Sequence, residues 1–289
     1  MTRYSFYMGC QTPARLEYCE ISTRRVLKTI GVDLLDLQNA GCCGCPYKPI
    51  NYDVALAMAA RVLAQAEENG LDLLVLCSSC LGWLSRVRDV LFQEEKLLRE
   101  MNALLRIEGL SLEKGINIVG LLQVLHSRIS DLQGRVKVPL EGLKVATMYG
   151  CHLLRPSRHM RIDNPENPQL LDELVEITGA KSIYWPLKLW CCGATTLPVD
   201  SRFSMSLARK KILDAKRSGA DCIVTICPSC QLTLDSMQPI VSKEFNEEYD
   251  LPVIFYPQLL GLAIGINPKE LGLERNRVIP NVLLDIAGK

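Results

Sequence analysis

The chain has 289 residues, which suits one large domain or two of about 140 residues each. Its 33 Lys and Arg against 32 Asp and Glu give a net charge of +1, and the basic residues are scattered, which excludes the basic stripe of a nucleic-acid-binding protein. Thirteen cysteines in a reducing compartment favour metal ligation or redox chemistry over disulfides.

The chain carries no pattern of a secreted or membrane-spanning protein. Its first residues, MTRYSFYMGC, contain charge and cysteine where a signal peptide has an apolar run. The longest uncharged run, residues 251–268, is interrupted by Pro252 and Pro257. We therefore predict a cytoplasmic protein that has no membrane span and binds no nucleic acid.

Predicted strands and helices alternate along the first half. In chain order they are the strand YSFYM before Cys10, a helix over 13–30, the strand VDLLDL, the loop GCCGCP at 41–46, an Ala-rich helix over 52–68, an apolar strand over 71–76 that ends in Cys77, and a helix that Cys80 opens. Residues 88–106 form a further helical stretch of mixed charge, either a docking surface for a partner subunit or a helix packed on its own domain.

The second half repeats this series. Its elements are the strand LKVATMY, a helix near 169–178, the strand SIYWPL, a helix near 201–217 and the strand DCIVTI. Strands alternating with helices predict an α/β fold, here two tandem βαβ-type repeats with parallel sheets, related by a pseudo-twofold axis. We predict one domain over 1–135 and another over 143–289, with the linker near 134–142.

The cysteines recur in the same order in both halves, at offsets of 141, 149 and 150 residues. The first half has Cys10, Cys42, Cys43, Cys77 and Cys80, and the second has Cys151, Cys191, Cys192, Cys227 and Cys230. Cys19, Cys45 and Cys222 have no counterpart in the other half. The repeat predicts that the ten recurring cysteines share a function.

All three cysteine groups of each half follow the carboxyl end of a predicted strand. That edge of a parallel sheet is where α/β folds bind ligands, and the helix N-termini there favour anionic sulfur. We therefore expect five thiols to converge at one edge in each half.

Five thiols narrow the choice of bound group. Structural zinc takes four ligands, so five is one too many. A vicinal pair serves two metal atoms more easily than one, which favours an iron–sulfur cluster, although an ordinary cubane would leave one thiol spare. The residues alone leave open zinc and a metal-free dithiol as alternatives.

The spacing of a cysteine, CCG and CxxC resembles that of the cysteine-rich CCG domain. A chain with two such units resembles the catalytic B subunits of heterodisulfide reductases. The resemblance implies a noncubane [4Fe-4S] cluster with five cysteine ligands in each half, and a small disulfide substrate that lies between the clusters and takes one electron from each. It assigns the ligands Cys10, Cys42, Cys43, Cys77 and Cys80 to one cluster, and Cys151, Cys191, Cys192, Cys227 and Cys230 to the other.

The resemblance implies an oxidoreductase that acts on a sulfur group and belongs to a complex. Its partners would be a ferredoxin-like C subunit, since no CxxCxxCxxxCP run exists in this sequence, and a flavin-containing A subunit. Direction stays open, because thiol–disulfide exchange runs either way according to potential. Two alternatives stay open: an electron-transfer subunit of a lactate, glycolate or glycerol-3-phosphate-type oxidoreductase, and a noncatalytic zinc-binding scaffold.

Two residues beside the second cysteine group are candidates for a catalytic role. His152 follows Cys151 and is either a proton donor to a leaving thiolate, a contact to an anionic substrate, or a structural hydrogen-bonding group. Lys188 precedes the vicinal pair and is a candidate for offsetting thiolate charge or binding an anionic substrate group, as is Lys48 in the first half.

The remaining polar and aromatic candidates are weaker. Four basic residues after His152 are either contacts to an anionic substrate or surface groups: Arg155, Arg158, His159 and Arg161. Cys45 is either a sixth thiol near the first group or a bystander. Trp185 and Trp190 either wall the site or pack in the core.

Overall fold

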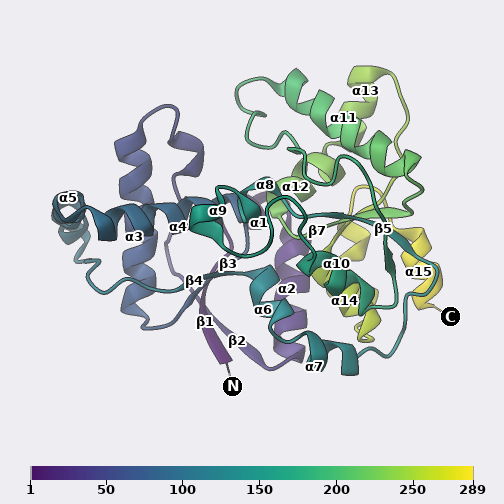
Figure 1. Ribbon diagram of the computed structural model, residues 1–289, viewed down its shortest axis with the longest axis horizontal. Helices are drawn as coiled ribbons and strands as arrows, with labels where there is room; N and C mark the ends of the chain where they lie inside the picture. The colour runs from purple at the N-terminus through teal and green to yellow at the C-terminus, as the bar shows by residue number, and fades with distance from the viewer. Residues whose placement is uncertain (1, 289) are drawn as a thin grey trace.

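The computed structural model describes residues 2–288, and these form two four-stranded sheets in which every strand pair is parallel (Figure 1). The first sheet contains β1 (Thr2–Tyr7), β2 (Val32–Asp36), β3 (Leu73–Val75) and β4 (Ile118–Gly120), in the order β2-β1-β3-β4. The second contains β5 (Lys144–Met148), β6 (Lys181–Ser182), β7 (Cys222–Thr225) and β8 (Val253–Phe255), in the order β6-β5-β7-β8. The predicted α/β fold with two parallel sheets is confirmed.

The helices and short turns of the first half connect its strands. They are α1 (Gln11–Arg15), α2 (Glu17–Thr29), η1 (Cys45–Tyr47), α3 (Tyr52–Glu68), α4 (Ser78–Gln93), α5 (Glu95–Leu105), η2 (Arg106–Glu108), α6 (Leu121–His126) and α7 (Ile129–Gly134). Figure 1 shows α3, α4 and α5 as one lobe, on the opposite side of the molecule from α11 and α13 of the second half.

The second half follows the same plan and adds turns at its end. Its elements are α8 (Cys151–Leu154), α9 (Ser157–Met160), α10 (Leu170–Glu176), α11 (Ser201–Arg217), α12 (Pro228–Gln231), the π-helix η3 (Leu232–Ser236), α13 (Gln238–Phe245), α14 (Tyr256–Ala263), η4 (Pro268–Leu271), η5 (Leu273–Arg275) and α15 (Asn281–Ala287).

Local sequence signals explain where the long helices begin. The side chain of Asn51 accepts a hydrogen bond from the Val54 backbone amide at the start of α3. Asp200 accepts one from Phe203 in the same way at the start of α11. Such caps satisfy a helix amide that has no partner within the helix. In both repeats the cap stands nine residues after the first cysteine of the vicinal pair, so the cysteine loops have matching lengths.

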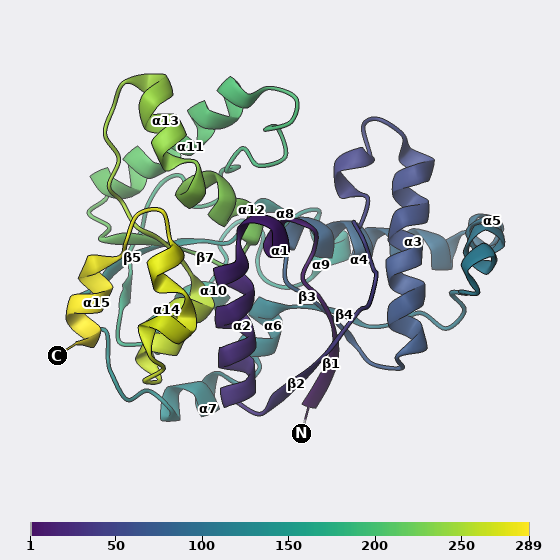
Figure 2. The same ribbon diagram turned by 180° about the vertical axis from the view of Figure 1, so that it is seen from behind.

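The two halves interlock through reciprocal helix contacts. Helix α2 of the first half packs on α14 of the second, and α10 of the second packs on α6 of the first (Figure 2). Similarly α4 packs on α8, and α12 on α1. Each of these helix contacts recurs with the halves exchanged, as the predicted pseudo-twofold relation requires.

A buried hydrogen bond also crosses the boundary between the halves. The Tyr18 hydroxyl in α2 donates to Asp235 in η3, 2.7 Å away. The predicted domain limits, 1–135 and 143–289, stay a prediction, and their end residues 1 and 289 lie outside the described part.

Three local predictions are wrong in their extent. The helix expected over 13–30 is broken at Leu16, whose φ of −136° leaves the helical range. The helical stretch 88–106 is two helices, divided at Glu94. The strand SIYWPL pairs with β5 only at Ser182 and through the Ile183 amide, which donates to the Val145 carbonyl. Beyond that point the Trp185 side chain turns into the core, where its indole donates to the Thr147 carbonyl, and Pro186 has no amide to donate.

No helix within residues 2–288 is long and apolar enough to cross a membrane. The apolar run 251–268 instead forms β8 and α14, whose side chains are almost all buried. Its hydrophobicity therefore serves the core of the second half.

Candidate functional site

The ten recurring cysteines lie in one continuous series of thiol neighbours. The Cys10 thiol is 3.8 Å from Cys42, and the Cys43 thiol is 3.2 Å from Cys80. Side-chain interactions between neighbouring thiols join the whole series, which runs Cys10, Cys42, Cys43, Cys80, Cys77, Cys227, Cys230, Cys192, Cys191 and Cys151. The series passes through the five cysteines of the first half and then through the equivalent five of the second half in the opposite order. The five predicted cysteines of each half therefore lie together, and the two sets meet at Cys77 and Cys227.

Each vicinal pair divides its two thiols between different neighbours. Cys42 faces Cys10 while Cys43 faces Cys80. In the second half Cys191 faces Cys151, and Cys192 faces Cys230. Among residues 2–288, however, no three His, Cys, Asp or Glu side chains are gathered in the way that would hold one metal ion.

The first cysteine of each vicinal pair has thiolate character. Hydrogen bonds from Cys10 and Cys43 lower the pKa of Cys42 to about 3, and those from Cys151 and Cys192 lower the pKa of Cys191 to about 2. The amide two residues further on adds to this effect in both halves, because it lies 3.5 Å and 3.3 Å from the respective sulfurs. Thiolates are the form of cysteine that binds metals.

The glycine after each vicinal pair lets a helix approach the cysteine loop closely. Gly44 has a φ of +82°, and a Cβ there would lie 2.5 Å from the carbonyl oxygen of Ala55 in α3. Gly193 has a φ of +90°, and a Cβ would lie 2.7 Å from the Ser204 carbonyl oxygen in α11. Only glycine combines this backbone conformation with this contact.

The two cysteine groups meet at Cys77 and Cys227, which occupy the same place in the two repeats. Each lies at the N-cap of a helix, α4 and α12 respectively. The hydrogen bond from Cys227 and burial raise the pKa of Cys77 to about 12. Serines of the opposite half support both thiols, since Ser229 lies 3.3 Å from Cys77 and Ser78 bonds to Cys227.

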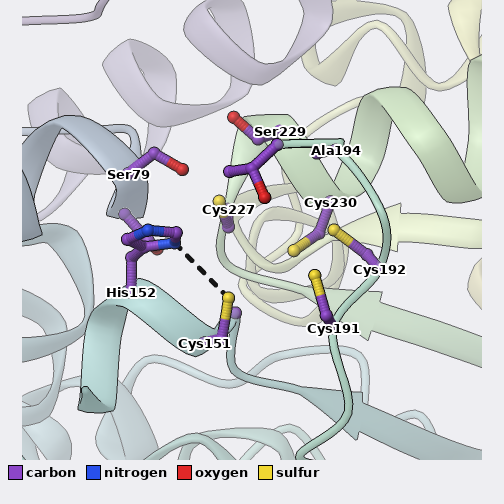
Figure 3. Close-up of a pocket in the computed structure, with 12 residues that line it drawn as sticks. Ser79, Cys151, His152, Cys191, Cys192, Ala194, Cys227, Ser229 and Cys230 are labelled. Carbon is purple, nitrogen blue, oxygen red and sulfur yellow. Dashed lines mark hydrogen bonds between the residues drawn. The ribbon is translucent and has the colours of Figure 1, made fainter. Parts of the chain in front are cut away.

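A pocket opens beside the second cysteine group. It encloses about 250 Å³, counting the part open to solvent. Figure 3 shows the thiols of Cys151, Cys191, Cys192 and Cys230 turned toward one another in it. Ser79 of the first half also lines it, so the pocket is built from both halves.

His152 lies in the pocket wall, at the start of α8 (Figure 3). Its Nδ1 is 3.4 Å from the Cys151 sulfur. Burial lowers the pKa of the imidazole, although the charge of Cys227 opposes the shift. A Cβ on Gly82 would lie 2.8 Å from the His152 carbonyl oxygen, so this glycine seats α8 directly on α4 of the other half.

Lys188 and Lys48 lie near the cysteines but are held by other groups. The Lys188 ammonium is 2.6 Å from a carboxylate oxygen of Asp172, and Lys188 lines a second hollow beside Cys151, of about 220 Å³ when the part open to solvent is counted. The Lys48 ammonium stacks on the Trp83 ring, 5.0 Å from its centroid. The catalytic roles of Lys188 and His152 stay predictions.

The basic residues after His152 are tied to protein groups. Arg155 donates to the Pro165 carbonyl, and His159 lies 2.8 Å from Asp89 of α4. Arg161 donates to the carbonyl of Arg158. These contacts indicate that the cluster holds the segment around α9 in place.

The other cysteine and tryptophan candidates separate into buried and exposed groups. Cys19, Cys45 and Cys222 are free and buried, and none of them belongs to the thiol series. Trp185 is buried in the core, whereas Trp190 is 53 % exposed and lines the second hollow. Trp190 is thus the tryptophan whose side chain borders the site.

One buried charge beside the second cysteine group was not predicted from the sequence. Lys211 in α11 is 1 % exposed, and its ammonium donates to the carbonyls of Leu187 and Trp190. Burial lowers its pKa to about 8, and ionised Cys192 and Cys230 would oppose that shift. The signal in the sequence was a lysine on the apolar face of a predicted helix.

The family described as cysteine-rich domain (CCG) matches residues 4–85 and 145–235, one segment in each half. Each segment contains all five recurring cysteines of its half. The fold is also similar to that of a solved structure, a hypothetical protein from Helicobacter pylori. The two superpose with a TM-score of 0.79 over 96 % of this chain and 52 % of that one, at 18 % identity.

Full-length relatives carry two kinds of name. The B subunit of the ferredoxin/F420H2-dependent CoB-CoM heterodisulfide reductase of Methanosarcina acetivorans is 34 % identical over 96 % of this chain and 94 % of its own. The membrane anchor subunit of the 8-methylmenaquinol:fumarate reductase of Wolinella succinogenes is 33 % identical over 94 % of this chain and 96 % of its own. The chain therefore belongs to the CCG cysteine-rich domain family and is related, over nearly its full length, to the B subunits of heterodisulfide reductases.

Proposed function

We propose that this chain is the catalytic subunit of a heterodisulfide reductase-type complex. It cleaves a small disulfide into two thiols, or runs the reverse reaction, at one noncubane [4Fe-4S] cluster in each half. The observation that carries the proposal is the division of each vicinal pair between two thiol neighbours. The proposed ligands are Cys10, Cys42, Cys43, Cys77 and Cys80 in one half, and Cys151, Cys191, Cys192, Cys227 and Cys230 in the other.

The donor set fits such clusters in number and in direction. Cysteine thiolates are the usual ligands of iron–sulfur clusters. Two adjacent thiols that face apart can bind different metal atoms of a multinuclear cluster. A single zinc ion does not need its ligands divided in this way. The glycines at 44 and 193 keep a side chain out of the close contact between each cysteine loop and the helix that supports it.

The reaction needs two electrons and two protons for each disulfide, and both sulfurs leave as thiols. When bound, the clusters supply the electrons and offer iron as an acceptor for sulfur. His152 holds an imidazole nitrogen 3.4 Å from the Cys151 sulfur, at the pocket wall. Burial lowers the pKa of the ring, so a ring that has taken up a proton readily passes it to a departing thiolate. The flanking serine of α4, Ser79, lines the other side and orients the substrate by hydrogen bonding.

The electrons require partner subunits. We infer a ferredoxin-like C subunit as the direct donor and a flavin-containing A subunit behind it, in line with the relative from Methanosarcina acetivorans, whose name includes ferredoxin. Cys10 is an exposed residue, so one end of the cysteine series lies at the surface of the first half, where a donor can approach.

A second candidate function is electron transfer without thiol chemistry. The relative from Wolinella succinogenes, named as a subunit of a quinol:fumarate reductase, favours it. In that case the cysteine series would carry electrons between partner subunits, and the pocket beside His152 would take no disulfide. Thiol turnover separates the two functions.

Metal and sulfide analysis of the anaerobically purified chain tests the proposal, together with EPR spectra recorded before and after thiol is added. We expect about eight irons and eight sulfides per chain, as two four-iron clusters require, and a paramagnetic signal that appears with thiol. About eight irons without any response to thiol would favour the electron-transfer function. About one zinc with little iron would reject both functions and leave a scaffold.

Replacing His152 tests its role as proton donor. The His152→Gln variant is expected to keep its iron and to lose about 10²- to 10³-fold in kcat for disulfide reduction, since general acid catalysis contributes on that scale. His126→Gln is the matched control, because His126 lies in α6 and pairs with Glu173, away from the pocket. Equal kcat values for the two variants would show that His152 is structural.

A further inference from the structure

One buried cation supports the cysteine loop of the second half. The Lys211 side chain is 1 % exposed, and its ammonium donates to the carbonyls of Leu187 and Trp190. Trp190 directly precedes the vicinal pair, so the ammonium lies against the loop that presents Cys191 and Cys192. The ring of Trp185 covers it, with the centroid 4.6 Å from the nitrogen.

The ammonium has no carboxylate partner within ion-pair distance among residues 2–288. Asp214 is near, but its carboxylate accepts the Leu187 amide, 2.9 Å away. If ionised, Cys192, Cys230 and Cys191 would each favour the ammonium, and more strongly than Asp214 does. A buried ion without a partner is strongly unfavourable, so this position is favourable where the cysteines hold an anionic group.

The first half has no charge at the equivalent position, and its Lys48 ammonium lies over the Trp83 ring instead. Counting from the vicinal pairs, Lys211 corresponds to Val62, which is fully buried. The loop before Cys42 is held instead by Arg61, which donates to the carbonyls of Asn39 and Ala40. The Arg61 guanidinium lies at the surface and pairs with Glu108 at 2.8 Å, so its charge is both screened by solvent and neutralised.

We propose that the Lys211 ammonium raises the reduction potential of the cluster in the second half above that of the cluster in the first. This inference rests on the proposed function. A fixed positive charge in a water-poor interior lowers the free energy of adding an electron to an anionic group, and the net charge around a cluster is one determinant of its potential. An electron that enters at the first half then settles in the second, beside the pocket lined by His152.

Two variants of Lys211 and one control separate charge from hydrogen bonding. Lys211→Gln keeps an amide that can donate to the loop carbonyls but removes the charge, and Lys211→Arg keeps both. Arg61→Gln is the matched control in the first half. In an EPR-monitored redox titration of the anaerobic chain, we expect Lys211→Gln to lower one of the two midpoint potentials by at least about 59 mV, a tenfold change in a one-electron equilibrium constant. Lys211→Arg and Arg61→Gln should each shift both potentials by less than half of that.

The other possible results of this titration and of iron analysis also support or overturn the inference. Unchanged potentials in Lys211→Gln would overturn the inference while leaving the proposed function intact. Loss of half the iron in Lys211→Gln, with full iron in Lys211→Arg, would support the role of the charge, because the second cluster would then need it to bind. Loss of iron in both variants would assign Lys211 to loop packing alone and overturn the inference. A wild-type chain without iron would reject the proposed function itself.

Discussion

The Cys43→Ala variant is expected to purify with about half the iron of the wild-type chain and to lose disulfide turnover at least about a thousandfold, a loss of ~4 kcal/mol in transition-state stabilisation. Cys43 is 1 % exposed and its sulfur lies 3.2 Å from that of Cys80. Removing it leaves four of the five recurring thiols in the first half and takes away the second member of the vicinal pair. Iron analysis and steady-state kinetics on the anaerobic protein check both effects.

Cys45 provides the matched control for this experiment. It stands two residues after Cys43 and is also buried, so Cys45→Ala removes a thiol of similar exposure from the same loop. Its thiol is outside the series of ten, and we expect its iron content and turnover to match the wild-type chain. Equal losses in the two variants would contradict the ligand assignment and show that the loop is merely sensitive to substitution.

The Gly44→Ala variant is expected to show the largest loss of stability among single methyl additions in the cysteine loops. The left-handed conformation costs about 1–2 kcal/mol for a residue with a Cβ. The Cβ would also lie 2.5 Å from the Ala55 carbonyl oxygen in α3, and relieving such an overlap costs typically about 1–3 kcal/mol more. The helix or the loop must therefore move, and the loop carries Cys42 and Cys43.

Gly41→Ala isolates the conformational part of this cost. Gly41 has a φ of +69°, but a Cβ there would meet no atom within 4 Å. We expect its melting temperature to exceed that of Gly44→Ala by roughly 2–12 °C, the equivalent of the overlap energy in a chain of this size. The comparison uses thermal unfolding of anaerobic protein, and equal melting temperatures would mean that α3 yields to the added methyl without cost.

The parts of the fold that the sequence predicted well were those fixed by short-range signals. Apolar runs marked the buried strands, and the caps at Asn51 and Asp200 begin α3 and α11 within the predicted ranges. The strand SIYWPL was predicted too long, because its apolar side chains have the same pattern in a strand and in a loop that buries Trp185. The hydrogen bond from the Trp185 indole to the Thr147 carbonyl in β5 is a tertiary contact that the local pattern does not show.

The sequence predicted which cysteines form the candidate site, but not which of their thiols contact one another. The repeat identified ten cysteines, and these are the ten thiols in the series. The contact between Cys77 and Cys227 depends on how the two halves pack, which no local pattern encodes. The sequence made Lys188 a candidate for binding a substrate. In the fold its ammonium donates to the Asp172 carboxylate, sixteen residues away, and no local pattern predicts this contact.

The contact between Cys77 and Cys227 also bears on how the two halves can differ. It joins equivalent positions, as an isologous interface of a homodimer does, and in a homodimer each substitution appears on both sides of the axis. Here both copies lie on one chain, so a codon change alters one side alone. Val62 and Lys211 are one such pair of positions. Because the two halves are parts of one chain, their two cysteine groups can differ in neighbouring residues. The two sites of a homodimer cannot differ in this way.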